Sequence, residues 1–560
     1  MTAPTRARLA LLAVALTCLT APTALAAPPT TPAPATVGIA PATARPASST
    51  VLSASVTAQV APAVPQPVSG TSGPPAPTPG ERRVDARLDR LRDRPQRLAA
   101  LLRRMPKGAE LHSHLWGAAS TELLMTLAAE DGLCVADTTS TALPPPCGPG
   151  TRPATDLRTD PRLRRRVLRA WSMEGFTPGE SGESGHDHFF ATFDKFAEPA
   201  ARHPGRLLAD VLDTAAAHHQ LHQELMHTVA GERTARLAER TGWDPDLARL
   251  HAKLTAGGAM AALVRTARTE TDRAVTEFRT AAACGTARAR PGCAVPFRLV
   301  FQVFRGAPPE HVFTQLTLGM ELARHDPRFV AVNLVQPEDG PVALRDYRLH
   351  MRMLDHLRGR YPEARITLHA GELTPELVPP QHLRFHIAEA VRTGHAERIG
   401  HGVDIRHEDG HRQLLRTMAA RGIAVETALT SNEQILGVSG DAHPFPLYRA
   451  HGVPVVLATD DQGVSRTDIT REYTRAARTY GLSYRDLKDL ARASLEHAFL
   501  PGRSLWRDPR RFCPVPQCAA ALGAARPPGR ACARHLAAHP KAALQWRQEL
   551  AFSRFEDTVP

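Results

Sequence analysis

Apolar runs of strand length alternate along this chain with longer stretches in which apolar residues recur at helical spacing. From the apolar runs we predict eight strands, at residues 108–114, 220–227, 297–305, 329–335, 365–370, 397–401, 422–428 and 454–459. Helical periodicity separates several of them, at residues 309–324, 345–359 and 410–421. Strands that alternate with helices in this way fit a (β/α)8 TIM-like barrel better than a doubly wound sheet.

Long segments outside this alternation predict additions to the barrel. The interval 115–219 is too long for one crossover between strands, so we expect an insertion after strand 1, at about residues 120–215. The aromatic run at residues 188–196 within it is typical of a helix packed on its neighbours, and such a helix would be able to cover the barrel mouth. Residues 82–510 would form the barrel, and residues 511–560 a helical, cysteine-containing tail.

The beginning of the chain has a different composition. Residues 1–26 combine Arg6 and Arg8, an apolar run and the triplet Ala24-Leu25-Ala26, a pattern that indicates a secretory signal peptide. Residues 27–80 are rich in Ala, Pro, Thr and Ser and predict a disordered linker. We therefore expect a secreted, extracellular protein without membrane insertion, because no other segment has the apolar length of a membrane span.

Cysteine spacing agrees with export to an oxidising compartment. Cys134 with Cys147 and Cys284 with Cys293 form two local pairs flanked by glycine or proline, as loops would be. The C-terminal trio Cys513, Cys518 and Cys532 allows one further pair and leaves one thiol. The spacing alone does not assign that last pair.

Charge narrows the range of partners. A net charge of +13 raises the possibility of a nucleic-acid partner, but arginines are spread through every segment among acidic residues. They do not gather into a stripe with aromatic residues, which nucleic-acid binding favours. We therefore expect a solvated basic surface, a small-molecule substrate and no nucleic acid, while the oligomeric state stays open.

Four of the predicted strands end in residues of the types that commonly bind metal ions. His112 and His114 lie two apart on strand 1 and so point to the same side, and His369 ends the strand at 365–370. His401 follows Gly400, and Asp460 and Asp461 close the last strand. In a barrel of parallel strands these carboxyl ends converge on one mouth.

The chemistry of this set favours a single zinc ion. Adjacent buried acids such as Asp460 and Asp461 are costly without a cation, and three imidazoles with one carboxylate suit zinc. Bound zinc would lower the pKa of a water molecule towards ~7. Glu372, three residues after His369, places a proton-transfer carboxyl beside the same site.

These motifs resemble those of the adenosine deaminase family of zinc-dependent amidohydrolases. The resemblance runs from about residue 105 to about residue 500 and comprises Ala-Glu-Leu-His-Ser-His (109–114), His-Ala-Gly-Glu (369–372), Arg-Ile-Gly-His-Gly (398–402), Thr-Ser-Asn (430–432) and Thr-Asp-Asp (459–461). It implies hydrolytic deamination of adenosine, or of a related 6-aminopurine nucleoside, to inosine or its analogue and ammonia. The secretion signal and the insertion are similar to those of the family's extracellular members.

The resemblance also implies a role for each residue. One zinc ion per chain would be held by His112, His114, His369 and Asp460. Glu372 would protonate the ring nitrogen beside the attacked carbon, His401 would orient and deprotonate the attacking water, and Asp461 would position the hydroxide or bind the substrate ring. Together with Asp461, the residues predicted to contact substrate are Trp116, Gln336 and Gly371.

Two positions depart from the family pattern. Where the family usually has an acidic residue that contacts the ribose hydroxyl, this chain has Trp116. Where the family has a glycine that allows the backbone to approach the nucleoside, this chain has Gln336. The metal chemistry is therefore expected to be intact and the substrate pocket altered, so another 6-aminopurine or a related amine is an alternative substrate. Thr-Ser-Asn-Glu-Gln (430–434) either shapes the pocket floor or caps a strand.

Other classes fit the sequence less well. His395-Ala-Glu397 resembles half of a cytidine-deaminase zinc site, but no Pro-Cys-x-x-Cys follows it. An amidohydrolase that cleaves amides or esters with two metals would need a bridging lysine, and the predicted strand ends carry none. A catalytically weak extracellular adenosine-binding factor would be expected to lack Glu372, His401 or Asp460, and all three are present.

Overall fold

The structure is a computed structural model that describes residues 76–179, 182–523 and 527–560. The predicted signal peptide (1–26) and most of the predicted linker (27–80) lie outside the described residues. The described chain enters its first helix at Pro79. Among the described residues, no helix combines the length and apolarity that crossing a membrane requires.

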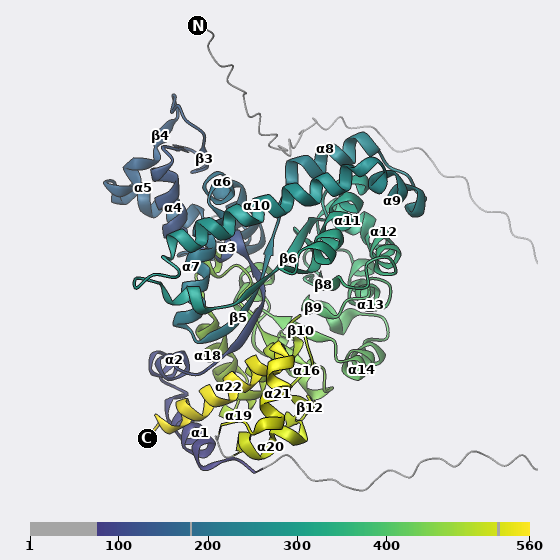
Figure 1. The fold of residues 1–560 in the computed structure, drawn as a ribbon. Coiled ribbons are helices and arrows are strands. Elements are labelled where there is room, and N and C mark those ends of the chain that lie inside the picture. Colours follow the sequence, from purple (N-terminus) through teal and green to yellow (C-terminus); the bar gives the residue numbers. More distant parts are fainter. Residues whose placement is uncertain (1–75, 180–181, 524–526) are drawn as a thin grey trace, which may run out of the picture. The chain divides into compact units, whose positions relative to one another are not determined.

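Eight parallel strands form the centre of the fold, as the sequence predicts (Figure 1). They are β1 Gly108–His114, β5 Gln220–His227, β6 Phe297–Phe304, β7 Phe329–Val335, β8 Arg365–Ala370, β9 Arg398–His401, β10 Ala424–Thr427 and β11 Val455–Leu457. Each strand pairs with the next along the chain. Ser113 forms a parallel bridge with Asp460, and the N–H of Asp460 donates to the carbonyl of His112, so β1 meets the end of β11 and the barrel closes.

Helices connect consecutive strands and cover the outside of the barrel. Figure 1 shows α11 to α14 following one another along one side of the strands. The connecting helices are α8 Gly231–Thr241, α9 Leu247–Thr255, α10 Ala259–Ala281, α11 Pro309–His325, α12 Pro341–Arg358, α13 His386–Arg392, α14 His411–Arg421, α15 Leu429–Leu436 and α16 Phe445–Ala450. Helices α17 Gln462–Ser465, α18 Ile469–Thr479 and α19 Tyr484–His497 follow the last strand, β11. The 3-10 turns are η1 Ala154–Arg158, η2 Ala256–Gly258, η3 Pro291–Ala294, η4 Pro380–Arg384, η5 Val403–His407 and η6 Gly440–Ala442.

The long interval after β1 folds into helices and a small antiparallel sheet. Its elements are α3 Leu115–Ala118, α4 Thr121–Glu130, β2 Cys134–Ala136, β3 Ala142–Leu143, β4 Thr151–Pro153, α5 Pro161–Ala170, α6 Gly185–Arg202 and α7 Pro204–Ala217. The aromatic run lies on α6, where Phe189 and Phe196 are buried in the core, as expected for helix packing. Helix α6 contacts α15 and α17, which follow the carboxyl ends of β10 and β11.

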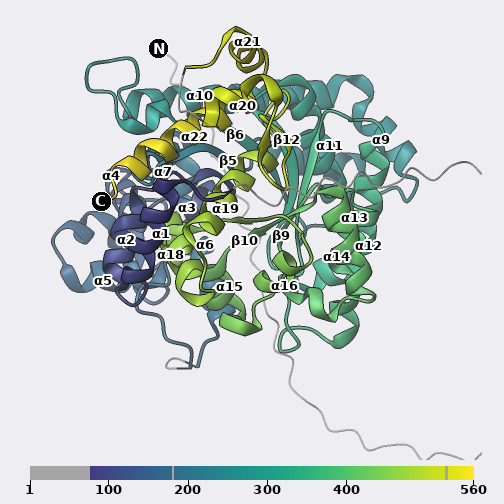
Figure 2. The same cartoon turned by 90° about the horizontal axis from the view of Figure 1, so that it is seen from below.

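The first and last helices pack together against α19. The elements are α1 Pro79–Leu91 and α2 Pro95–Arg103 at the start, and β12 Trp506–Asp508, β13 Cys513–Pro514, α20 Pro516–Gly523, α21 Arg530–Ala538 and α22 Pro540–Asp557 at the end. Figure 2 shows α22 beside α1 and α19. The buried Nζ of Lys488 on α19 joins them, at 2.9 Å from Oε1 of Glu81 and 2.7 Å from Oε1 of Glu556.

Three disulfides tie loops and the C-terminal tail. Both predicted local pairs form, Cys134 with Cys147 and Cys284 with Cys293. The tail pair that spacing left open is Cys518 with Cys532, and Cys513 is the free cysteine of the described residues. The helical character predicted for residues 511–560 agrees with α20, α21 and α22, while β12 and β13 were not predicted.

Candidate active site

The predicted metal ligands and the predicted catalytic residue His401 lie at the carboxyl ends of four strands. His112 and His114 belong to the end of β1, His369 to β8 and His401 to β9, and Asp460 follows β11. His401 and Asp460 have φ angles of +67° and +57°, in the left-handed region that non-glycine residues seldom adopt. Backbone strain of this kind is maintained by the surrounding fold and clusters at functional sites.

The four predicted ligands converge on one point. Oδ1 of Asp460 lies 3.5 Å from Nε2 of His112 and 3.3 Å from Nε2 of His114. Nε2 of His369 lies 3.2 Å from Nε2 of His114. His401 joins the group, because one ligand atom each of His112, His369, His401 and Asp460 lie within 4.8 Å of one another.

Hydrogen bonds on the far side of each ring leave these Nε2 atoms with free lone pairs. Nδ1 of His112 donates to Glu426 (2.7 Å) and Nδ1 of His369 to Oδ1 of Asn333 (2.9 Å), an oxygen that also accepts the backbone N–H of His369. Nδ1 of His114 meets Oε1 of Gln302 at 2.7 Å. Such partners fix the tautomer in which Nε2 binds a metal.

The ligand atoms of this cluster are therefore suited to a bound cation. Nε2 of His112 and Oδ1 of Asp460 are buried without a hydrogen-bond partner among the described residues, and the lone pairs of His114 and His369 face each other. Although burial opposes it, the nearby carboxylates of Asp460 and Glu426 raise the pKa of His112 to about 10. The site favours positive charge, and three nitrogens with one carboxylate oxygen are a donor set suited to zinc.

Glu372 lies at the edge of this cluster, held by the loop after β8. Its Oε1 is buried, makes no hydrogen bond and lies 3.4 Å from Nδ1 of His401. The carboxylate of Glu338 accepts the N–H groups of Gly371 and Glu372, and Gly371 turns the chain at a φ of +77°. Burial, together with the nearby Asp460 and Glu338, raises the pKa of Glu372 well above its ordinary value, so this carboxyl is suited to donate a proton.

The other predicted substrate residues have varied surroundings. Oδ1 of Asp461 is buried without a hydrogen-bond partner and lies so close to Gly117 that a Cβ there would be 1.8 Å away. Trp116 precedes that glycine and packs, partly buried, against the core. Gln336 is exposed at a φ of +82°, and its Oε1 accepts the N–H of Gly306. The structure thus brings Asp461 to the metal cluster, because one ligand atom each of His114, Asp460 and Asp461 lie within 4.8 Å of one another. The Gln336 amide is turned towards the neighbouring loop at Gly306.

Several residues that hold the site were missed by sequence reasoning. Ser431 and Asn432 lie on α15, where Oγ of Ser431 donates to Oδ2 of Asp460 and Nδ2 of Asn432 meets Nδ1 of His401 at 2.9 Å. The segment 430–434, for which sequence left a pocket floor and a strand cap open, thus contacts the cluster through these two side chains. Glu426 and Asn333 are polar residues inside apolar strands, a signal that was present in the sequence.

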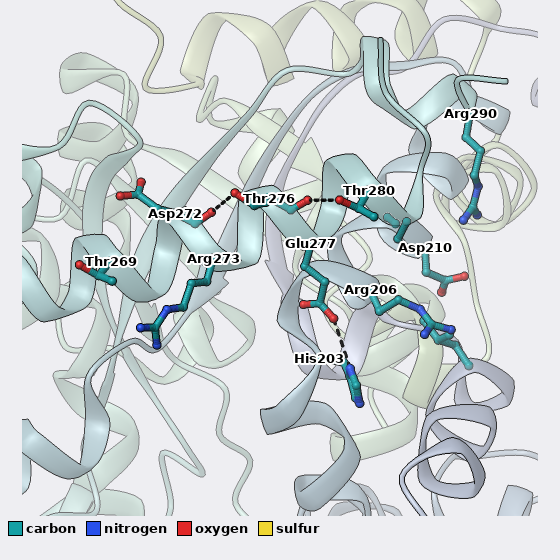
Figure 3. Close-up of a pocket in the computed structure, with 13 residues that line it drawn as sticks. His203, Arg206, Asp210, Thr269, Asp272, Arg273, Thr276, Glu277, Thr280 and Arg290 are labelled. Atoms are coloured by element: carbon teal, nitrogen blue, oxygen red, sulfur yellow. Dashed lines mark hydrogen bonds and ion pairs between the residues drawn. The ribbon is translucent and has the colours of Figure 1, made fainter. Parts of the chain in front are cut away.

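Two other candidate functional sites lie outside this cluster, the His395 motif and a surface pocket. Nε2 of His395, part of the cytidine-deaminase-like motif, pairs with Asp355 and lies before β9, at the opposite end of the strand from His401. A surface pocket of about 970 Å³ between α7 and α10 is lined by charged residues such as Arg206, Arg273 and Glu277 (Figure 3). None of the predicted site residues lines it.

Replacing Glu426 tests whether the far-side hydrogen bonds support metal binding. In Glu426→Gln, a neutral amide replaces the carboxylate at His112, and we expect metal affinity to fall by about 10 to 100-fold. Competition with a chelator measures this affinity. Glu433→Gln, an exposed acid on α15, is the matched control. Equal affinities in the two variants would show that the carboxylate does not support the metal site.

The fold and the site together define a (β/α)8 barrel whose strand ends carry a cluster of histidines and aspartates that could hold a metal ion. The adenosine deaminase family model matches residues 264–505. Adenosine deaminases from two Escherichia coli strains, SMS-3-5 and O7:K1, are 39% and 40% identical over 145 and 137 residues, which are 26% and 24% of this chain. Residues 264–505 of this chain are thus similar to the adenosine deaminase family. The matched region spans 40% and 38% of the length of these two relatives.

Two solved structures are more distantly similar. The crystal structure of Arabidopsis N6-mAMP deaminase has 20% identity and a TM-score of 0.46, with 71% of this chain and 95% of that chain covered. An amidohydrolase with bound zinc from Burkholderia ambifaria has 18% identity and a TM-score of 0.46, with 82% and 94% covered.

Proposed function

We propose that the protein uses one zinc ion to deaminate adenosine, or a closely related 6-aminopurine nucleoside, by hydrolysis, giving inosine or its analogue and ammonia. The observation that carries this proposal is the convergence of His112, His114, His369 and Asp460, with their free ligand atoms, beside the carboxyl of Glu372. The match of residues 264–505 to the adenosine deaminase family model supports the choice of reaction.

The residues of the site divide the chemistry among them. A bound zinc ion would act as a Lewis acid that lowers the pKa of water. Glu372 carries the proton that a purine ring nitrogen needs, which makes the adjacent carbon electrophilic. His401 and Asp461 hold the water oxygen that attacks this carbon, and breaking the carbon–nitrogen bond releases ammonia.

The substrate class rests on the pocket residues as well. Trp116 offers an apolar indole where the family pattern has an acid for the ribose, and the Gln336 side chain is engaged with Gly306. A 6-aminopurine with a different sugar, or a related amine, is the second candidate that these two residues favour.

The test is an assay of the full chain for ammonia release. Adenosine, 2'-deoxyadenosine, adenine, AMP and cytidine are compared with and without a chelator, and zinc is then restored. We expect turnover of a 6-aminopurine compound, loss with chelator and recovery with zinc. Ammonia from cytidine alone, or from none of these compounds, would contradict the proposed function.

We also propose that the protein acts outside the cell. The signal-like residues 1–26 and the three disulfides support this location, because disulfides persist in oxidising compartments. Amino-terminal sequencing of protein from the culture medium should find a chain that starts near residue 27. A chain retained in the cytosol with Met1 in place would contradict it.

A further inference from the structure

A row of hydrogen bonds runs behind His401, on the side away from the metal cluster. The backbone N–H of Phe445 donates to Nδ1 of His443 over 3.1 Å. Nε2 of His443 lies 3.1 Å from Oδ1 of Asn432, and Nδ2 of Asn432 lies 2.9 Å from Nδ1 of His401. All three side chains are buried, so water does not compete for these bonds.

The backbone group at one end fixes the direction of the whole row. A backbone N–H only donates, so Nδ1 of His443 must be the acceptor, and a neutral His443 carries its hydrogen on Nε2. That N–H donates to the oxygen of Asn432. The opposite amide orientation would set the Asn432 NH2 against this N–H. Burial lowers the pKa of His443 to about 4, which agrees with a neutral ring at pH 7.

The amide of Asn432 then determines where His401 carries its hydrogen. Its NH2 group donates to Nδ1 of His401, so the neutral imidazole has its hydrogen on Nε2. Oε1 of Glu372 also faces Nδ1, but at the longer distance of 3.4 Å. Nε2 of His401 is buried without a partner among the described residues and lies in the group with His112, His369 and Asp460.

We propose that Phe445, His443 and Asn432 hold His401 in the tautomer with hydrogen on Nε2, so that Nε2 of His401 donates a hydrogen bond to the attacking oxygen. His443 and Asn432 are positioning residues that act through His401. The catalytic part rests on the proposed function, whereas the tautomer does not.

This inference differs from the role that family resemblance implies for His401. A base must accept a proton at the nitrogen that faces the water, and here that nitrogen already carries one. Protonation at Nδ1 is opposed as well, because the Asn432 NH2 group points at it. A fixed tautomer of this kind lets a histidine keep one direction of hydrogen bonding throughout a reaction.

Nitrogen-15 NMR of the full chain, with labelled histidines, reads the tautomer directly. The His401 signals are identified by their loss in His401→Gln, and we expect the pattern of an Nε2-protonated ring. Asn432→Asp replaces the donor to Nδ1 with an acceptor, so His401 should switch to the Nδ1-protonated form. Because the donor to the oxygen is then lost, we expect kcat to fall by about 100-fold with KM little changed.

Three further variants separate positioning from a general structural effect. Gln413→Glu makes the same amide-to-acid change at an exposed position of α14, so the His401 tautomer and kcat should stay unchanged. His443→Gln still offers an N–H to Asn432 and should retain most activity, whereas His443→Leu should not. An Nδ1-protonated His401 in the unaltered chain, or an Asn432→Asp variant with unchanged tautomer and kcat, would overturn the proposal. The spectra need no substrate, so they remain decisive even if no aminopurine is deaminated.

Discussion

Replacing Glu372 with glutamine is expected to abolish most turnover while leaving the metal bound. The carboxyl is buried, makes no hydrogen bond through Oε1, and has a raised pKa, which suits it to carry a proton. An amide of the same shape has no such proton to donate. We expect kcat for the best substrate to fall by about 10² to 10⁴-fold, the usual contribution of a general acid.

Steady-state kinetics and metal analysis of the same preparation measure this effect. Glu376→Gln, an exposed acid in the loop after β8, is the control for a nearby change of charge and should keep full activity. If Glu372→Gln retained the turnover of the unaltered chain, the acid would have to be another group. If it lost its metal, the residue would belong to the metal site.

Removing the carboxylate of Asp460 should have an equally large effect on metal binding. Asp460→Ala deletes the carboxylate oxygen that faces both His112 and His114 and leaves three imidazoles as the remaining ligands. Because removing even a partner of a ligand costs about 10 to 100-fold in affinity, we expect losing the ligand itself to cost more than about 100-fold.

Competition with a chelator measures the affinity of Asp460→Ala, and circular dichroism checks that the barrel still forms. Asp441→Ala, in the exposed turn η6, is the matched control. Affinity in Asp460→Ala equal to that of the unaltered chain would remove Asp460 from the ligand set.

The barrel and the main cluster were predictable because their signals are local. Buried parallel strands require continuous apolar runs, and four of the runs here stop at a histidine or an aspartate, as in Ile366-Thr367-Leu368-His369. Parallel strands bring their carboxyl ends together. The ligands were therefore expected to converge although His112 and Asp460 are far apart in the sequence.

The supporting residues were not predictable because their roles depend on contacts between distant strands. Glu426 lies in the run Ala-Val-Glu-Thr and meets His112 only once β1 and β10 are placed in the barrel. His443 reaches His401 through Asn432, and the sequence gives no spacing rule for such a row. The small sheet of β2, β3 and β4 escaped prediction because its strands have two or three residues.

The metal content of the purified chain tests the central claim most directly. Elemental analysis of protein prepared without added metal or chelator should find one zinc ion per chain, and dialysis against a chelator should remove it together with the activity. A chain that contains no divalent metal, binds none when zinc is supplied, and keeps its activity would contradict the account.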